Sequence, residues 1–266
     1  MSHRSLFRAA PCLSFTAMCL SLTVALGCEE TKTEAVVTTQ AASTAPAQAA
    51  QPAPAPAPLS APTIAVTESG PTVRGMTALV LRENGEVDVV GRGKLTGYLA
   101  EEKTFLSGND LTIQVERQAK PQAVSILLSE LSKLSPGKIR IATETRAEFP
   151  REIEFVPQES LSKLDPCTLV GAVTADRGAA IWKISGGTAR KRGRGMGGPD
   201  LSMTAETIVS MKKGCESDVF FVGGAEGVEW GLVYDLAASA MALEKAALKR
   251  AVAPTLPLVA GNRVDI

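Results

Sequence analysis

Four cations lie close enough together to act on a ligand as one group. Arg190, Lys191, Arg192 and Arg194 fall within five residues of a chain whose formal net charge is +0. Such clustering produces a local positive field even on a neutral molecule. The segment is therefore a candidate site for an extended anionic partner, such as a cell-wall polymer or an acidic protein face. A solvated loop is the alternative interpretation.

A second pattern follows directly, because Gly193, Gly195 and Gly198 have the spacing of dinucleotide-binding loops. These glycines follow basic residues where such a loop needs a strand. A helix is expected from residue 201 with Asp200 or Ser202 as its N-cap, and Asp200 in that role would occupy the N–H groups that a phosphate would use. We therefore expect no nucleotide, and neither another cofactor nor a metal.

The N-terminus indicates where the chain works. Arg4 and Arg8 precede a largely apolar stretch, residues 9–27, which ends just before Cys28. A charged start, an apolar middle and a small residue before the cleavage site are typical of an export signal. The cysteine after Gly27 resembles the lipobox of bacterial lipoproteins, which implies that Cys28 is acylated, although Ala25 stands where Leu is usual. A plain secretory signal and an uncleaved anchor helix are alternatives, and each places the rest outside the cytoplasm.

The composition of residues 28–72 predicts a disordered tether, because this segment is rich in Ala, Pro and Thr and poor in large apolar side chains. About forty such residues span on the order of 100 Å. Glu29 stands where Asp retains many lipoproteins at the inner membrane, which favours the outer membrane. We expect a lipid anchor in the bacterial envelope, facing the periplasm, with an envelope protein or peptidoglycan as partner. The balanced charge does not suggest nucleic acid.

Removal of residues 1–27 also removes His3, the one histidine of the chain. Catalytic triads and zinc sites that depend on histidine are then excluded. The remaining catalytic candidates are the carboxylates of Glu226, Glu229 and Asp235, which a glycosidase-like pair would need. The leading hypothesis is a non-enzymatic interaction module. An envelope hydrolase with paired carboxylates and a small-ligand-binding lipoprotein are the alternatives.

Cys167 and Cys215 are the cysteines left once the signal and Cys28 are set aside. Disulfides persist in an oxidising compartment, and each of the two precedes an expected strand. We therefore predict a structural disulfide between them. Trp182 and Trp230 are expected in the core.

The spacing of apolar residues predicts two α+β units, residues 73–157 and 158–266, each a hairpin, a helix, a strand, a helix and a strand. In the first unit the expected strands are 77–81, 86–90, 111–115, 138–142 and 152–156, and the helices are 95–105 and 121–134. In the second the strands are 168–173, 180–184, 219–222 and 256–264, and the helices are 201–213 and one from 228 onward. The repeated order suggests an internal duplication.

Two stretches carry a family resemblance. Residues 228–236, VEWGLVYDL, look like the aromatic-glycine opening of the last helix in the periplasmic domains of the ExbD/TolR biopolymer-transport family. Residues 111–115, followed by apolar residues at 123–124 and 127–128, occupy the same place in the first unit. The resemblance covers residues 73–145 and, more loosely, 168–250. It implies a periplasmic module that binds partners, and in TolR-like cases the cell wall. The apolar segment 9–27 has no acidic residue, so the family's proton-coupling role does not carry over.

Overall fold

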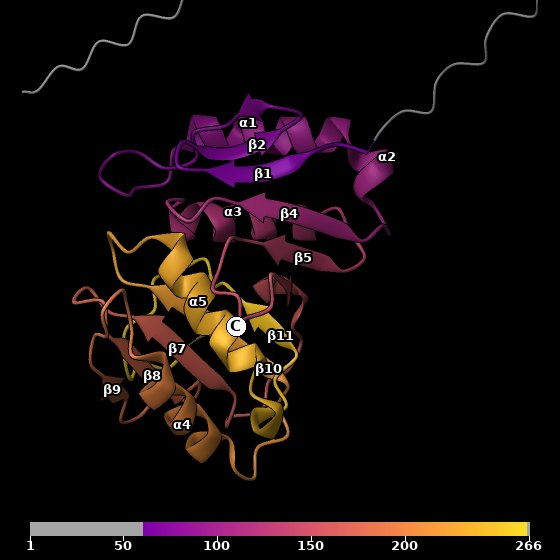
Figure 1. The fold of residues 1–266 in the computed structure, drawn as a ribbon. Coiled ribbons are helices and arrows are strands. Elements are labelled where there is room, and N and C mark those ends of the chain that lie inside the picture. Colours follow the sequence, from indigo (N-terminus) through magenta and orange to yellow (C-terminus); the bar gives the residue numbers. More distant parts are fainter. Residues whose placement is uncertain (1–60, 265–266) are drawn as a thin grey trace, which may run out of the picture. The chain divides into compact units, whose positions relative to one another are not determined.

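The computed structural model describes residues 61–264, so the signal segment, Cys28 and most of the expected tether lie outside the described part. The described residues belong to one compact unit, Ala57–Ile266. Its secondary structure is mixed α and β, as expected, around an 11-stranded sheet of order β3-β2-β1-β4-β5-β6-β11-β10-β7-β8-β9 (Figure 1).

The first half of the fold contains eight elements, five strands and three helices. They are β1 (Ile64–Thr67), β2 (Gly70–Val73), β3 (Met76–Thr77), α1 (Val89–Glu101), α2 (Lys103–Leu106), β4 (Leu111–Val115), α3 (Pro121–Ser132) and β5 (Ile139–Ala142). Strands β3, β2 and β1 form an antiparallel meander, whereas β1, β4 and β5 are parallel.

The second half follows the same order of elements, with a single helix where α1 and α2 stand in the first. They are β7 (Leu169–Val173), β8 (Ala179–Lys183), β9 (Arg190–Arg192), α4 (Leu201–Lys212), β10 (Val219–Gly224), α5 (Trp230–Met241) and β11 (Arg250–Val252). Strands β7, β10 and β11 are parallel, and β8 and β9 continue the sheet antiparallel beyond β7. Between the halves, β6 (Glu152–Phe155) is antiparallel to β5 and parallel to β11. Two short 3-10 turns, Gln158–Ser160 and Glu244–Ala246, complete the elements.

The start of the folded part differs from the expectation in two ways. Strands β1 and β2 lie inside the range expected as tether, so its boundary at residue 72 is wrong: Ile64, Val66 and Val73 are buried, although they follow an Ala/Pro-rich segment. The hairpin expected over 77–81 and 86–90 is reduced to one bridge, Leu81 to Val87. The last two residues of its expected second strand, 89 and 90, are helical instead, because the Asp88 carboxylate accepts from the Gly91 N–H at 2.9 Å and starts α1.

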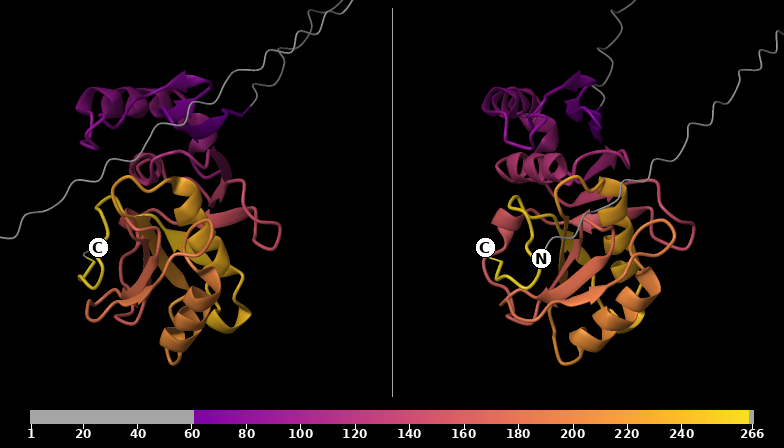
Figure 2. Two further views of the ribbon diagram at one scale, coloured as in Figure 1. Left: turned by 60° about the vertical axis from the view of Figure 1, so that its left-hand side comes forward. Right: turned by 90° about the vertical axis from the view of Figure 1, so that its left-hand side faces the viewer.

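The end of the chain was also predicted incorrectly. The closing strand is β11, Arg250–Val252, and not residues 256–264. The latter segment packs through Leu258, Ala260 and Val264 against an apolar sheet face that contains Trp182 and Phe221. Figure 2 shows this yellow segment and the orange helix α4 on opposite sides of the second half's strands. Leu258, Ala260 and Val264 are therefore partly buried by covering the sheet, without joining it, whereas Leu256 and Val259 are exposed.

Helix α5 is central to the core, since almost all of its residues are buried. Trp230 packs against Phe155 at 5.6 Å and Tyr234 at 6.2 Å between ring centroids. The hydroxyl of Tyr234 donates to the Arg151 carbonyl at 2.7 Å, and burial raises the pKa of this phenol. Trp182 is likewise fully buried, so the prediction that both tryptophans belong to the core is confirmed.

A buried carboxylate links α1 to α3. Glu130, with 1% of its side chain exposed, accepts from Arg92 at 2.7 Å, from Thr96 at 3.0 Å and from Lys133 at 2.7 Å. Burial alone would raise the pKa of Glu130, but the hydrogen bonds from Lys133, Arg92 and Thr96 outweigh it and lower the pKa. The carboxylate is therefore held in its charged form.

Because the pKa of Glu130 is lowered on folding, its stabilising effect should be complete above its ordinary value of 4.5. It should be lost as the pH falls through the folded-state pKa. Glu130→Gln should therefore lower the free energy of unfolding at pH 7 by roughly 1–3 kcal/mol. Denaturant titrations between pH 7 and pH 3 should give the variant a shallower loss of stability than the parent. Parallel pH curves would assign the acid sensitivity to other carboxylates.

Candidate functional site

Cys167 and Cys215 form a disulfide, as predicted, with 5.8 Å between their Cα atoms. It joins the residues before β7 to the end of α4. Asp165 lies within 4.8 Å of both sulfurs and accepts from the Cys167 N–H at 2.9 Å. Because the two sulfurs are bonded to each other, this cluster is a structural link and not a metal site.

The basic segment is placed differently from the expectation. Instead of lying wholly in a glycine-rich loop, Arg190–Arg192 forms strand β9, paired with β8 from Ile181 to Ala179. Arg194 follows in a tight turn, where the Gly195 N–H donates to the Gly198 carbonyl at 2.7 Å. The four cations therefore occupy the last strand of the sheet and the turn after it.

Helix α4 positions two of these cations. The Arg192 guanidinium donates to the Thr207 hydroxyl at 2.7 Å, and that of Arg190 lies 3.4 Å from the Ser210 hydroxyl. Neither acceptor carries charge. Among the described residues, none of the four cations forms an ion pair, whereas five arginines of the first half do: Arg74, Arg82, Arg92, Arg117 and Arg140. The positive charge of the segment is thus not neutralised by carboxylates in direct contact with it.

The glycines after β9 do not form a phosphate cradle. They do follow a strand, which corrects one reason for excluding a dinucleotide. The second reason is confirmed, because the Asp200 carboxylate accepts from the Met203 N–H at 3.1 Å and caps α4. A side chain at Gly198 would meet Leu232 at 2.7 Å, so this glycine allows close packing on α5.

Of the three candidate carboxylates, Asp235 is engaged in an ion pair, whereas Glu226 and Glu229 line the same surface cavity. Asp235, with 7% of its side chain exposed, is bound by the Arg117 guanidinium at 2.8 Å and by the Thr145 hydroxyl at 2.6 Å. Glu226 and Glu229 are exposed and line a surface cavity of about 530 Å³. This cavity is also lined by residues 83–86 and 118–120, among them Lys120.

The loop after β4 meets the loop after β10 at the start of α5. The N–H groups of Trp230 and Gly231 donate to the carbonyls of Ala119 at 2.8 Å and Arg117 at 2.7 Å. The side chain of Arg117 crosses Gly231 so closely that a Cβ there would lie 2.9 Å from it. The hydrogen bond to Asp235 is the main cause that raises the pKa of Arg117.

Sequence patterns did not indicate Arg117, Thr145 or Lys120. The partners Arg117 and Asp235 are 118 residues apart, and Arg117 belongs to no local motif. The one sequence signal that pointed to this contact was the repeated order of elements. In that order, the loops after β4 and β10 occupy corresponding positions, each between a strand and the helix that follows it.

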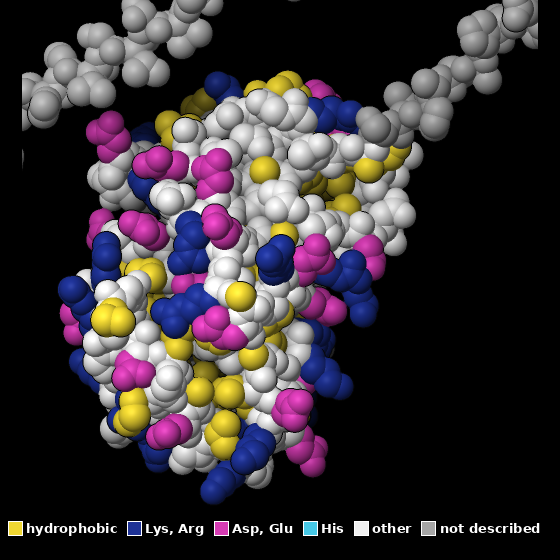
Figure 3. Space-filling model, in the orientation of Figure 1, with side chains coloured by type: hydrophobic (Ala, Val, Ile, Leu, Met, Phe, Trp, Pro, Cys, Tyr) yellow, Lys and Arg dark blue, Asp and Glu magenta, His cyan; other side chains and the backbone are white. Residues whose placement is uncertain are grey.

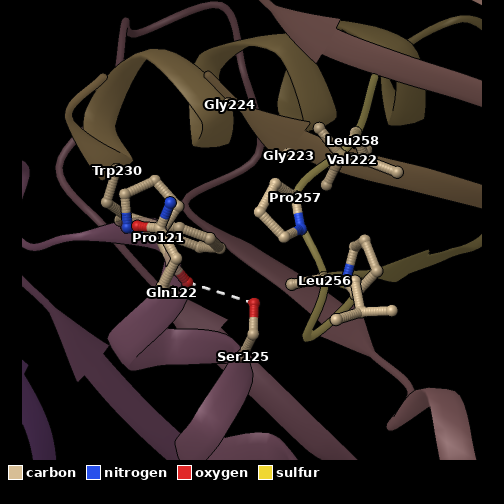
Figure 4. Close-up of a pocket in the computed structure, with 12 residues that line it drawn as sticks. Pro121, Gln122, Ser125, Val222, Gly223, Gly224, Trp230, Leu256, Pro257 and Leu258 are labelled. Carbon is tan, nitrogen blue, oxygen red and sulfur yellow. Dashed lines mark hydrogen bonds between the residues drawn. The ribbon is translucent and has the colours of Figure 1, made fainter. Parts of the chain in front are cut away.

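A narrow void beside Trp230 is not a ligand site. Figure 4 shows Gln122 and Ser125 of α3 across from Leu256 and Pro257 of the C-terminal segment. The space between them is about 10 Å³, close to the size of one water molecule.

The face drawn in Figure 3 carries acidic and basic side chains interspersed, without a broad region of one sign. Within residues 61–264, no helix is long and apolar enough to span a bilayer. No protein-family model matches the chain, and neither a curated protein nor a solved structure is similar enough to count as a match.

Proposed function

We propose that the chain is a lipid-anchored, non-enzymatic module of the bacterial cell envelope that binds an anionic partner through Arg190, Lys191, Arg192 and Arg194. The observation that carries this proposal is the absence, among the described residues, of any ion pair to these four cations. Cations left without a carboxylate partner remain available to an external anion.

The export part of the proposal rests on the sequence of residues 1–28 and on the disulfide between Cys167 and Cys215. Disulfides of this kind persist outside the reducing cytoplasm. Acylation of Cys28 would hold the module to the membrane, and the Ala/Pro-rich segment would let it reach a partner at a distance.

We further propose that the folded part arose by duplication of an ExbD/TolR-like unit. Two facts support this: the same order of elements in each half, and matching strand orders, β3-β2-β1-β4-β5 and β9-β8-β7-β10-β11. The two meanders lie at the two outer ends of the sheet. What the resemblance then implies is partner binding in the periplasm, without proton coupling.

If Cys28 is the lipid site, Cys28→Ser should leave the chain either unprocessed or released from the membrane. Fractionation of cells should then find the mature variant in the soluble periplasmic fraction, or the full-length precursor in the membrane. Cys19→Ser is a matched control, because it removes a cysteine of the signal without touching the proposed lipid site. Normal processing and full membrane retention of Cys28→Ser would rule out the lipid anchor.

Replacement of all four cations by Ser should weaken pull-down of peptidoglycan or of the envelope partner. The melting temperature should change little, because three of the replaced side chains are exposed and the half-buried Arg192 donates to the uncharged hydroxyl of Thr207. Binding by the parent should fall with salt, since exposed charges are screened over about 8 Å at physiological ionic strength. A matched control replaces four exposed lysines elsewhere, Lys94, Lys103, Lys163 and Lys245. Equal binding by the four-cation variant at low salt would refute the proposed contact.

A further inference from the structure

We propose that β9 accepts a short, extended acidic peptide segment, which adds to the sheet as its next strand. This inference rests on the proposed function, because it specifies the chemistry of the anionic partner. It is carried by one juxtaposition: the un-neutralised cations lie on the strand that forms one outer end of the sheet.

Strand β9 has one side that is open to a further strand. β9 pairs with β8 on one side, and among residues 61–264 no strand pairs with its other side. The outer side of an edge strand presents a row of main-chain N–H and C=O groups. Extended peptides bind such edges by completing these hydrogen bonds, and pockets or charges on alternate residues then supply specificity.

The open stretch has defined ends. On one side, the Gly187 N–H donates to the Gly261 carbonyl at 2.9 Å. On the other, the chain turns back on itself, and the Asp200 N–H donates to the Gly193 carbonyl at 3.1 Å. Residues 188–192 remain between these two contacts. A partner strand of about five residues fits this edge, which is near the usual length of a strand.

The cations of β9 alternate between the two faces of the strand. Side chains on a strand point alternately to its two faces. Arg190 reaches Ser210 and Arg192 reaches Thr207, both on α4, so Lys191 lies on the opposite face. A strand added beside β9 would therefore find a cation on each face. The pKa of Asp176 is lowered first by the hydrogen bond from the Thr174 hydroxyl, and the charge of Lys191 is the last of its causes.

The charge and the main-chain groups of β9 determine which class of partner can bind at this edge. A second copy of β9 would bring six cations together, and like charges on edge strands are a common means of preventing such pairing. A glycan or polyphosphate chain has no main-chain N–H and C=O groups to complete the edge. An acidic peptide satisfies both the charge and the hydrogen bonds.

The test uses the full chain in detergent and three synthetic peptides of alternating Glu and Val. The first has an unmodified backbone, the second is N-methylated at every second amide, and the third at every amide. All three carry the same charge. The second peptide keeps free N–H groups along one side of its backbone and can still pair with β9 through that side. Its dissociation constant should therefore be within a few-fold of that of the first peptide. The third should bind at least about tenfold more weakly, because it loses its donors and is blocked sterically.

Two further measurements locate the site. The unmodified peptide should slow hydrogen exchange at amides of residues 190–192. The variant with Arg190, Lys191 and Arg192 replaced by Glu should lose this peptide and gain a Lys-Val peptide of the same length, which a general loss of folding would not produce. Equal binding of the first and third peptides, or no exchange protection at β9, would refute strand addition. Both outcomes leave the proposed electrostatic contact intact, whereas equal binding by the four-Ser variant refutes the contact itself.

Discussion

Arg117→Ala should lower the free energy of unfolding by about 3–5 kcal/mol, the usual cost of removing one partner of a buried ion pair. The substitution leaves the Asp235 carboxylate buried, with 7% of its side chain exposed and only the Thr145 hydroxyl beside it. It also removes the side chain that crosses the start of α5. Urea denaturation followed by tryptophan fluorescence measures the change, since Trp230 begins this helix.

Three matched variants test this explanation. Asp235→Asn should cost less, because Arg117 is 31% exposed and can turn toward water. The double variant Arg117→Met/Asp235→Leu should recover most of the loss, because it leaves no buried charge. Arg140→Ala removes a pair whose side chains are 39% and 51% exposed. It should cost only about 0–1 kcal/mol. If the double variant is as unstable as Arg117→Ala, packing and not charge explains the effect.

The paired substitution Cys167→Ser/Cys215→Ser is expected to cost up to about 4 kcal/mol. The disulfide closes a loop with a sequence separation of 48 residues. Opening such a loop restores to the unfolded chain an entropy worth roughly 4 kcal/mol at room temperature. The Cys215 side chain is also buried, so the serine hydroxyl adds a smaller penalty.

Two measurements check the disulfide. Mass spectrometry of the alkylated, non-reduced chain should find no free thiol at either cysteine. Reduction of the parent by dithiothreitol should lower its stability to that of the double variant, whereas the double variant itself should not respond. Alkylation of both cysteines in the native protein would contradict the bond, and equal stability of parent and variant would contradict its expected contribution.

Local patterns predicted the elements whose signals are contained in a few residues. The strands over 111–115 and 219–222 and the helix over 121–134 were predicted to within two residues, because each combines apolar periodicity with a clear start or stop. Asp200 was correctly predicted as a helix cap, which needs only the N–H groups of the next turn.

The errors come from segments whose conformation depends on distant partners. Residues 64–73 follow an Ala/Pro-rich segment and form a hairpin because β4 pairs with β1 along its free side. Residues 190–192 are a strand because β8 holds them, although three consecutive cations favour a solvated loop when considered alone. Residues 256–264 are apolar enough for a strand, but β11 already occupies the position beside β10.

By itself, the sequence determined the mixed α and β class and the two cysteines that would pair. Each of these follows from periodicity or from elimination, which do not require knowledge of the three-dimensional neighbours. The tertiary structure decided that Arg117 neutralises Asp235, that the loops after β4 and β10 meet at α5, and that the cluster of cations lies on the edge of the sheet. These features are relations between residues far apart in the chain, and whether a strand is at an edge depends on what pairs beside it, which no local pattern contains.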